Sequence, residues 1–426
     1  MKPAEQRSAY AAFAMVFLLM AVYFVLRPVR DAMASDWSDT EVSLLWNIQF
    51  FISSGIVMLY CWCISRISFK QVVPMVYGLF ALSFLMFYLI TQTMSDPILV
   101  EKAFYLWVTA FSLLNLSVFW SFMSETFSKN QGKRLFPFIG AGASAGAIIG
   151  PAIPTIFAGT LGAANLMLLS AMGLLMVIPL VLYLSRTGSA RQTGAIINEG
   201  RDQPGMTDSW WSGFTAVLNN RYLLLIAVFI VLYVLLNGFV YFQQKNLLAD
   251  FSRADRTRIL GGIDWLVNVL TFVFAFALTG RMVRRLGMGL TLASVPLLMC
   301  LGLLILAIAP AVVVLLAIQV TRRVGNYAIT RPGREMLFTQ VTQDERYKAK
   351  PVIDVVVYRG GDAVSASLFA LLTDGLGLGL LGMSLIGSML AAIWAGAGIY
   401  LGRCFEHQQT NQANGYTVKA VADQQA

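Results

Sequence analysis

Arginines interrupt the apolar sequence between residues 319 and 361. The charged side chains that break this stretch include Arg322, Arg323, Arg331, Arg334, Glu335, Asp354 and Arg359. An ionised side chain at bilayer depth costs about 2.5–3.5 kcal/mol on insertion scales, so such residues usually face a protein interior or a water-filled path. Guanidinium groups bind phosphate and carboxylate in a planar, two-pronged geometry. The segment therefore predicts an anion site inside a membrane protein.

Helical spacing groups several of these residues. Arg323 and Arg334 lie eleven residues apart, which leaves about 20° between them on a straight α-helix. Three polar residues share this face: Asn326, Tyr327 and Thr330. We expect Arg322, Arg323 and Arg334, with Asn326 and Tyr327, to bind substrate, and Pro332 to kink the helix. The alternative for Arg334 is that it reaches the membrane interface or pairs with Glu335.

The first apolar stretch ends in a second charged group. Arg27 and Asp31 are four residues apart, so they form a pair on one helix face. This pairing leaves Arg30 to bind substrate. The alternative is that Arg30 anchors the helix at the outer interface.

Acidic residues supply candidates for gating or ion coupling. Glu125 ends an apolar stretch, where it can pair with Lys133 or Arg134 as a gate or titrate with a coupled proton. Asp264 is an intramembrane acid without a partner nearby in the sequence, and we expect it to face an outer vestibule.

A second predicted gate lies where Glu335 is followed by residues 350–362. It pairs Asp354 with Lys350 or Arg359. The alternative for Arg359 is an internal pair with Asp362, three residues on. Paired buried charges cost less than single ones, which favours such internal pairs.

Composition places the whole chain in a membrane. Of its 426 residues, 58% are hydrophobic and 12% are charged, whereas soluble domains carry about 25% charged residues. The net charge of +9 fits basic loops on the cytoplasmic side better than nucleic-acid binding. With four cysteines and one histidine, the sequence shows no metal-ligand spacing and no catalytic pair. We expect no enzyme activity, no metal and no cofactor.

Twelve stretches are long and apolar enough to span a bilayer. They fall at residues 9–30, 42–65, 71–93, 99–126, 135–158, 163–185, 221–243, 258–281, 288–308, 311–339, 351–373 and 378–402. The predicted fold is an all-α membrane protein of two six-helix halves, 1–184 and 222–402. A cytoplasmic linker, 185–221, joins the halves, and 403–426 forms a cytoplasmic tail. Glu125 and Glu335, 210 residues apart, are a weak sign of a repeat.

The Lys/Arg distribution predicts the orientation. With the N-terminus inside, nineteen basic residues fall on the inner face and five on the outer face. The outer five are Lys102, Lys245, Arg253, Arg256 and Arg258. We therefore expect both termini to be cytoplasmic in a bacterial inner membrane.

Two glycine-containing motifs bear on the fold. Gly142, Gly146 and Gly150 make successive small-xxx-small steps that let another helix approach closely. They also resemble the glycine–proline motif of antiporters, although packing alone explains them. Residues 280–287 resemble a degenerate major facilitator loop signature, with Arg284 at the usual acidic position. Twelve spans in two similar halves is the arrangement of major facilitator transporters, whose substrate site lies near the membrane midplane.

Two blocks resemble the ATP:ADP antiporter, or nucleotide transporter, family. The first runs from Trp120 to Glu125 and continues at residues 131–137; the second comprises residues 334–336, 348–350, 353–355 and 359–361. The resemblance implies functional roles for Arg30, Glu125, Lys350 and Arg359. Two positions depart from the family pattern: arginine replaces a lysine in the first span, and Asn237 is the polar residue nearest to an expected acid in the seventh.

These features predict a secondary-active transporter that exchanges or imports phosphorylated anions, nucleotides first, by alternating access. Its partners would be a small anionic substrate and the lipid bilayer, and the protein would be a monomer that binds no nucleic acid. One alternative is a proton-coupled major facilitator transporter or exporter of another metabolite or drug. The other is a membrane scaffold or sensor, but intramembrane charges in both halves count against it.

Overall fold

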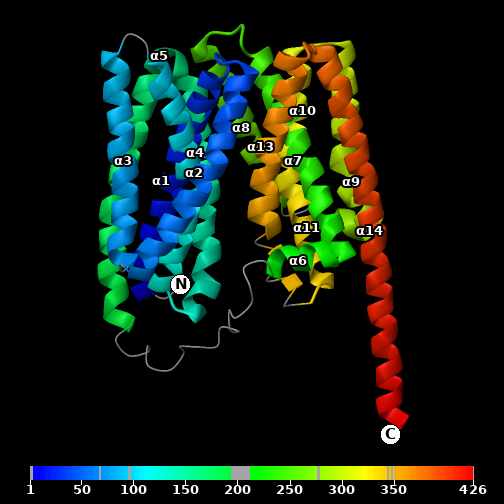
Figure 1. Ribbon diagram of the computed structural model, residues 1–426. Coiled ribbons are helices and arrows are strands. Elements are labelled where there is room, and N and C mark those ends of the chain that lie inside the picture. The colour runs from blue at the N-terminus through cyan, green and yellow to red at the C-terminus, as the bar shows by residue number, and fades with distance from the viewer. Residues whose placement is uncertain are drawn as a thin grey trace. The chain divides into compact units, whose positions relative to one another are not determined.

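The computed structural model describes residues 3–66, 69–94, 97–192, 212–275, 279–342, 345–346, 349–350 and 352–425, and in these ranges it holds helices and turns but no strand (Figure 1). Eleven of its helices are long and apolar enough to cross a membrane. One of them, Asn130–Arg186, has the length of two spans, because Gly162 breaks it with a positive φ of 72°. The all-α, twelve-span prediction is confirmed.

The chain divides into two compact units, and the first comprises Met1–Pro204 and Leu248–Val269. Leu248–Val269 comes from the second half of the sequence, yet it belongs to this unit. The helices of the unit are α1 (Pro3–Ala34), α2 (Asp39–Arg66), α3 (Phe69–Thr93), α4 (Ile98–Thr126), α5 (Lys129–Gln192) and most of α8 (Arg253–Ala275).

The glycine motif of α5 is a helix-packing surface within the first unit. A Cβ atom at Gly142 would lie 2.6 Å from the Phe13 carbonyl oxygen, and one at Gly150 would lie 2.6 Å from that of Ala21. Both carbonyls belong to α1. The expectation that another helix approaches closely at this motif is confirmed, and α1 is that helix.

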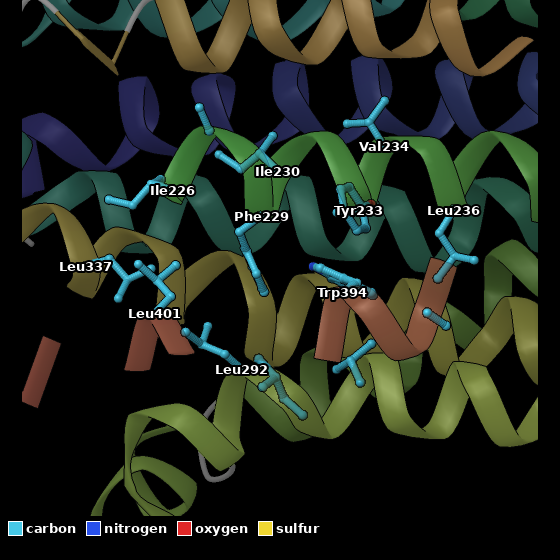
Figure 2. Close-up of a cluster of buried hydrophobic side chains, with 14 of the residues drawn as sticks. Ile226, Phe229, Ile230, Tyr233, Val234, Leu236, Leu292, Leu337, Trp394 and Leu401 are labelled. Carbon is cyan, nitrogen blue, oxygen red and sulfur yellow. The ribbon is translucent and has the colours of Figure 1, made fainter. Parts of the chain in front are cut away.

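The second unit comprises Gly205–Leu247 and Leu270–Ala426. Its elements are α6 (Ser212–Asn219), α7 (Arg221–Leu247), α9 (Thr279–Ile308), α10 (Val312–Gly325), η1 (Asn326–Thr330), α11 (Arg331–Leu337), η2 (Phe338–Gln340), η3 (Val352–Val357), α13 (Tyr358–Ala370), η4 (Leu371–Gly375) and α14 (Leu380–Gln425). Figure 2 shows its buried core, where Phe229 and Tyr233 of α7 lie beside Trp394 of α14. The ring centroids of both residues are 5.5 Å from that of Trp394.

Several connecting regions contain more helix than apolar length alone predicts. In the expected linker, α5 continues to Gln192 and α6 occupies Ser212–Asn219, while residues 193–211 lie outside the described ranges. The expected tail is the continuation of α14 to Gln425. The loop-like signature at residues 280–287 is helical up to Gly287, whose positive φ of 76° precedes the ninth span.

Helix starts reveal an internal repeat of 214 residues. Ser38 caps α2 and exchanges hydrogen bonds with Glu41, and Ser252 caps α8 in the same way with Asp255. Two further boxes of this kind, 214 residues apart, join Ser128 to Gln131 and Thr342 to Glu345. Reciprocal bonds of this type define capping boxes. The offset of 210 expected from Glu125 and Glu335 is therefore wrong by about one helical turn.

Candidate functional site

Two adjacent arginines are buried on α10 of the second unit. The exposed fractions of Arg322 and Arg323 are 7% and 8%. Arg322 donates to Gln319 Oε1 from Nε at 3.1 Å and from Nη2 at 2.7 Å, and it also donates to Asn237 Oδ1 on α7. Amide oxygens orient a guanidinium group without neutralising it, so this part of the span keeps strong anion-binding capacity.

The predicted single face from Arg323 to Arg334 is wrong, because the helix changes type between them. Asn326–Thr330 forms a π-helix, in which the Arg331 N–H bonds to the Asn326 carbonyl five residues earlier. Pro332 has no N–H to continue an α-helical ladder, and its ring crowds the turn before it. The wider turn rotates the later residues, so Thr330 is buried while Tyr327 is exposed.

Charged residues at the end of α11 form a network with the chain around η3. Arg334 lies 3.2 Å from Asp354 and 3.4 Å from Glu335, and Lys350 lies 2.6 Å from Glu335. The predicted pairing of Asp354 with Lys350 or Arg359 is therefore wrong. The alternative for Arg359 is confirmed, since it lies 3.7 Å from Asp362. The kinked backbone after η1 brings Arg334 to Asp354, and local spacing could not show this.

In the first unit, Arg30 is already engaged, which contradicts the expectation that it is left for substrate. Its Nη2 and Nε donate to Asp31 Oδ1 at 2.6 and 2.9 Å, and its Nη1 donates to Thr109 Oγ1 of α4 at 3.0 Å. The guanidinium carbon also lies 5.1 Å from the centroid of the Tyr105 ring. Arg30 thus sits in a built polar and aromatic environment between α1 and α4.

Asp264 has a partner, although none lies near it in sequence. Arg27 Nη1 lies 3.6 Å from Asp264 Oδ1, and the exposed fraction of Asp264 is 3%. The predicted pair of Arg27 with Asp31 is present, at 3.8 Å. Arg27 therefore stands between two carboxylates, one on its own helix and one on α8.

A second ionic cluster, absent from the sequence predictions, joins α8 to the ends of α1 and α4. Arg253 lies 2.5 Å from both Asp36 and Glu101, and Arg256 lies 2.5 Å from Asp36. Arg256 also donates to the Leu248 carbonyl at 2.9 Å. Arg253 and Arg256 were expected to be outer-loop residues, but they lie in the first turn of α8.

The predicted gate of Glu125 with Lys133 or Arg134 is replaced by another pair. Arg134 lies 3.2 Å from Glu5, and Gln131 donates to the same carboxylate at 3.1 Å. Glu125 and Lys133 are exposed. Glu5 precedes the first expected span, so only tertiary contact could identify it as the partner.

Lys245 is a further buried charge that sequence analysis placed in an outer loop. It lies in the last turn of α7, its exposed fraction is 4%, and its Nζ is 6.0 Å from the Phe242 ring centroid. The 214-residue repeat offers the missing signal, because Lys245 is the counterpart of the intramembrane Asp31. Within the described residues, no group of three or more His, Cys, Asp or Glu side chains could hold a metal ion.

Comparison with known proteins shows the fold. No protein-family model matches this chain, and no curated protein matches it. The solved structure of the nucleoside transporter NupG matches with a TM-score of 0.64 at 13% identity, over 95% of this chain and 99% of that chain.

This chain has the major facilitator fold. A POT family transporter in complex with 5-aminolevulinic acid matches with a TM-score of 0.64 at 13% identity, over 94% of this chain and 96% of that one. A bacterial homologue of the human lysosomal transporter Spinster gives 0.61 at 13%, over 96% and 99%. With its apolar helices, the fold makes this chain a multi-pass membrane protein.

Proposed function

We propose that this protein is a secondary-active transporter that exchanges or imports phosphorylated anions, nucleotides first, by alternating access. The observation that carries the proposal is the pair of buried arginines on α10, with Arg322 oriented by two amide side chains. Two adjacent buried cations are costly in a membrane and have a use where an anion binds. The fold agrees, because the proteins that match it are transporters, one of them of nucleosides.

Each unit contributes arginines to the proposed chemistry. Arg30 in the first unit and Arg322, Arg323 and Arg334 in the second would bind phosphate oxygens, and Asn326 and Tyr327 would contact the rest of the substrate. Binding requires Arg30 and Arg334 to exchange their present carboxylate partners, Asp31 and Asp354, for the substrate. A phosphate group competes well because it carries more charge than a carboxylate and accepts paired guanidinium bonds.

The charged networks near the helix ends would serve as gates. One is the Arg334, Asp354, Glu335 and Lys350 network of the second unit, and the other is the Arg134–Glu5 pair of the first. We place both on the cytoplasmic side of a bacterial inner membrane, with both termini inside, because basic residues concentrate there. Glu125, Lys133 and Arg359 remain coupling candidates near these networks.

A proton-coupled transporter of another metabolite is the alternative, and the burial of Asp264 favours it. A buried carboxylate that gains a proton loses its attraction for Arg27, which would couple protonation to helix movement. This alternative predicts that transport collapses when the proton gradient is dissipated. Nucleotide exchange would continue under the same treatment.

The Arg323→Ala variant tests the anion site. The purified protein is heated with ATP, ADP, sugar phosphates, amino acids or peptides, since a ligand of the folded state raises the melting temperature by mass action. We expect ATP or ADP to stabilise the wild type and to lose this effect in Arg323→Ala, which should still insert and fold. Equal stabilisation of both proteins by ATP would exclude Arg323 from the site.

A further inference from the structure

Two arginines and two aspartates form a neutral cluster inside the first unit. Arg27, Arg30 and Asp31 come from α1, and Asp264 comes from α8. The Arg30–Asp31 pair is hydrogen-bonded at 2.6 Å, whereas Arg27 is 3.8 Å from Asp31 and 3.6 Å from Asp264. These two distances exceed hydrogen-bonding range. Arg27 is therefore shared between two carboxylates and held closely by neither of them.

The same two helices are joined again farther along. Arg256 of α8 lies 2.5 Å from Asp36, which follows the end of α1. Asp36 is nine residues after Arg27 and Arg256 is eight before Asp264, so both contacts fit one antiparallel register of about 1.5 Å per residue. The contact at Asp36 is short and the contact at Arg27 is long. The Arg27–Asp264 pair is thus the weaker of these two ionic connections between α1 and α8.

We propose that a bound phosphorylated anion draws Arg27 and Arg30 away from Asp264 and Asp31, and thereby releases α8 from α1. This inference rests on the proposed function. A phosphate group offers several acceptor oxygens and paired guanidinium bonds, which the long contact to Asp264 does not provide. Asp264 then becomes a buried carboxylate that has lost its partner, a strongly unfavourable state. Movement of α8 that gives Asp264 access to water relieves it.

Neighbouring contacts leave α8 able to respond along this part of its length. Asn268 donates to the Ala147 carbonyl of α5 at 2.8 Å, and a Cβ atom at Gly261 would lie 3.1 Å from the Pro151 carbonyl oxygen. Glycine thus allows α8 to lie against α5 without a side chain between them. Residues 256–264 of α8 connect the Arg27 contact to the Asp36 contact. This segment is the part whose stability should report release.

Asp264→Asn tests the proposal because it removes the competing charge at nearly constant shape. We expect ATP to bind this variant about tenfold more tightly than the wild type, since Arg27 no longer has to leave a carboxylate. Amide hydrogen exchange in residues 256–264 should rise when ATP binds the wild type, and should already be raised in the variant without ATP. Asp264→Glu keeps the charge and should keep wild-type affinity.

The matched control is Asp255→Asn on the same helix. Asp255 is 3.5 Å from Arg258 on α8, and its side chain is about half exposed. This variant should change neither ATP affinity nor the ATP response of residues 256–264. Arg27→Gln gives an independent test should Asp264→Asn fail to fold: ATP should no longer raise hydrogen exchange in this segment, and a persisting rise would overturn the proposal.

The outcomes separate this inference from the proposed function. If the wild type binds ATP and Asp264→Asn binds it equally or more weakly, the competition is absent and the inference is overturned while the proposed function stands. If the wild type binds neither ATP nor any other phosphorylated anion, the proposed function fails and this inference fails with it. A purely structural Asp264 would lower stability in the variant without raising ATP affinity.

Discussion

Arg322 shows how a membrane helix can present a charge that is oriented by neutral groups. Gln319, one turn earlier, and Asn237, on α7, both direct their amide oxygens to its guanidinium. In a medium of low dielectric constant the guanidinium retains a strong field, which attracts an anion. A carboxylate at either amide position would fix Arg322 equally well but would offset that field.

Asn237→Asp tests this reasoning at a single residue. The substitution keeps the shape of the side chain and places a negative charge beside Arg322, so ATP affinity should fall about tenfold, or about 1.4 kcal/mol. Titration of the purified variant with ATP measures the change, and Asn237→Gln serves as the neutral control. ATP binding by Asn237→Asp at wild-type affinity would show that Arg322 is not part of the anion site.

Residue pairs divide into those that spacing can predict and those that it cannot. Arg27–Asp31 and Arg359–Asp362 follow from helix geometry and are present. The partners of Asp264 and Arg134 lie more than a hundred residues away in the sequence, at Arg27 and Glu5. No local rule could select them, because many basic and acidic residues end spans at the same membrane level.

At the level of elements, the span boundaries follow from apolar length, whereas helix type does not. The start of the ninth span at residue 288 was predictable because Gly287 precedes it with a positive φ. Pro332 announced a kink, but not that η1 would absorb it by widening into a π-helix. π-Helical turns are rare and occur frequently at functional sites. Here η1 follows the two buried arginines directly.

The contact between α1 and α5 makes a prediction about stability. A Cβ atom at Gly146 would lie 3.0 Å from Met20 Cβ and still closer to the Phe17 carbonyl, so Gly146→Ala should lower the free energy of unfolding by about 1–3 kcal/mol. Gly140 has no atom within 4 Å of the same position. Gly140→Ala should therefore be neutral or slightly stabilising, because alanine favours helix over glycine.

Denaturant unfolding in detergent, followed by circular dichroism, compares the two variants. Opposite signs would confirm that the close approach of α1 depends on Gly146. Equal stability of Gly146→Ala and the wild type would contradict the packing of α1 against this glycine stripe.

For the whole molecule, the repeat of 214 residues links sequence to mechanism. Related halves are the basis of rocking motions in transporters of this fold. The halves have diverged in charge: Asp31 corresponds to Lys245, and Thr109 corresponds to Arg323. The first unit therefore holds a neutral cluster of arginines and aspartates, while the second holds buried cations. This asymmetry is what a carrier of anions requires if one half binds charge and the other responds to it.

Exchange by reconstituted protein tests the central claim most directly. Proteoliposomes loaded with ATP are placed in labelled ADP, with and without a protonophore, and uptake is compared between the wild type and Arg323→Ala. The account predicts rapid exchange by the wild type, unchanged by the protonophore and lost in the variant. Uptake of no phosphorylated anion, together with protonophore-sensitive uptake of a neutral or cationic compound, would contradict it.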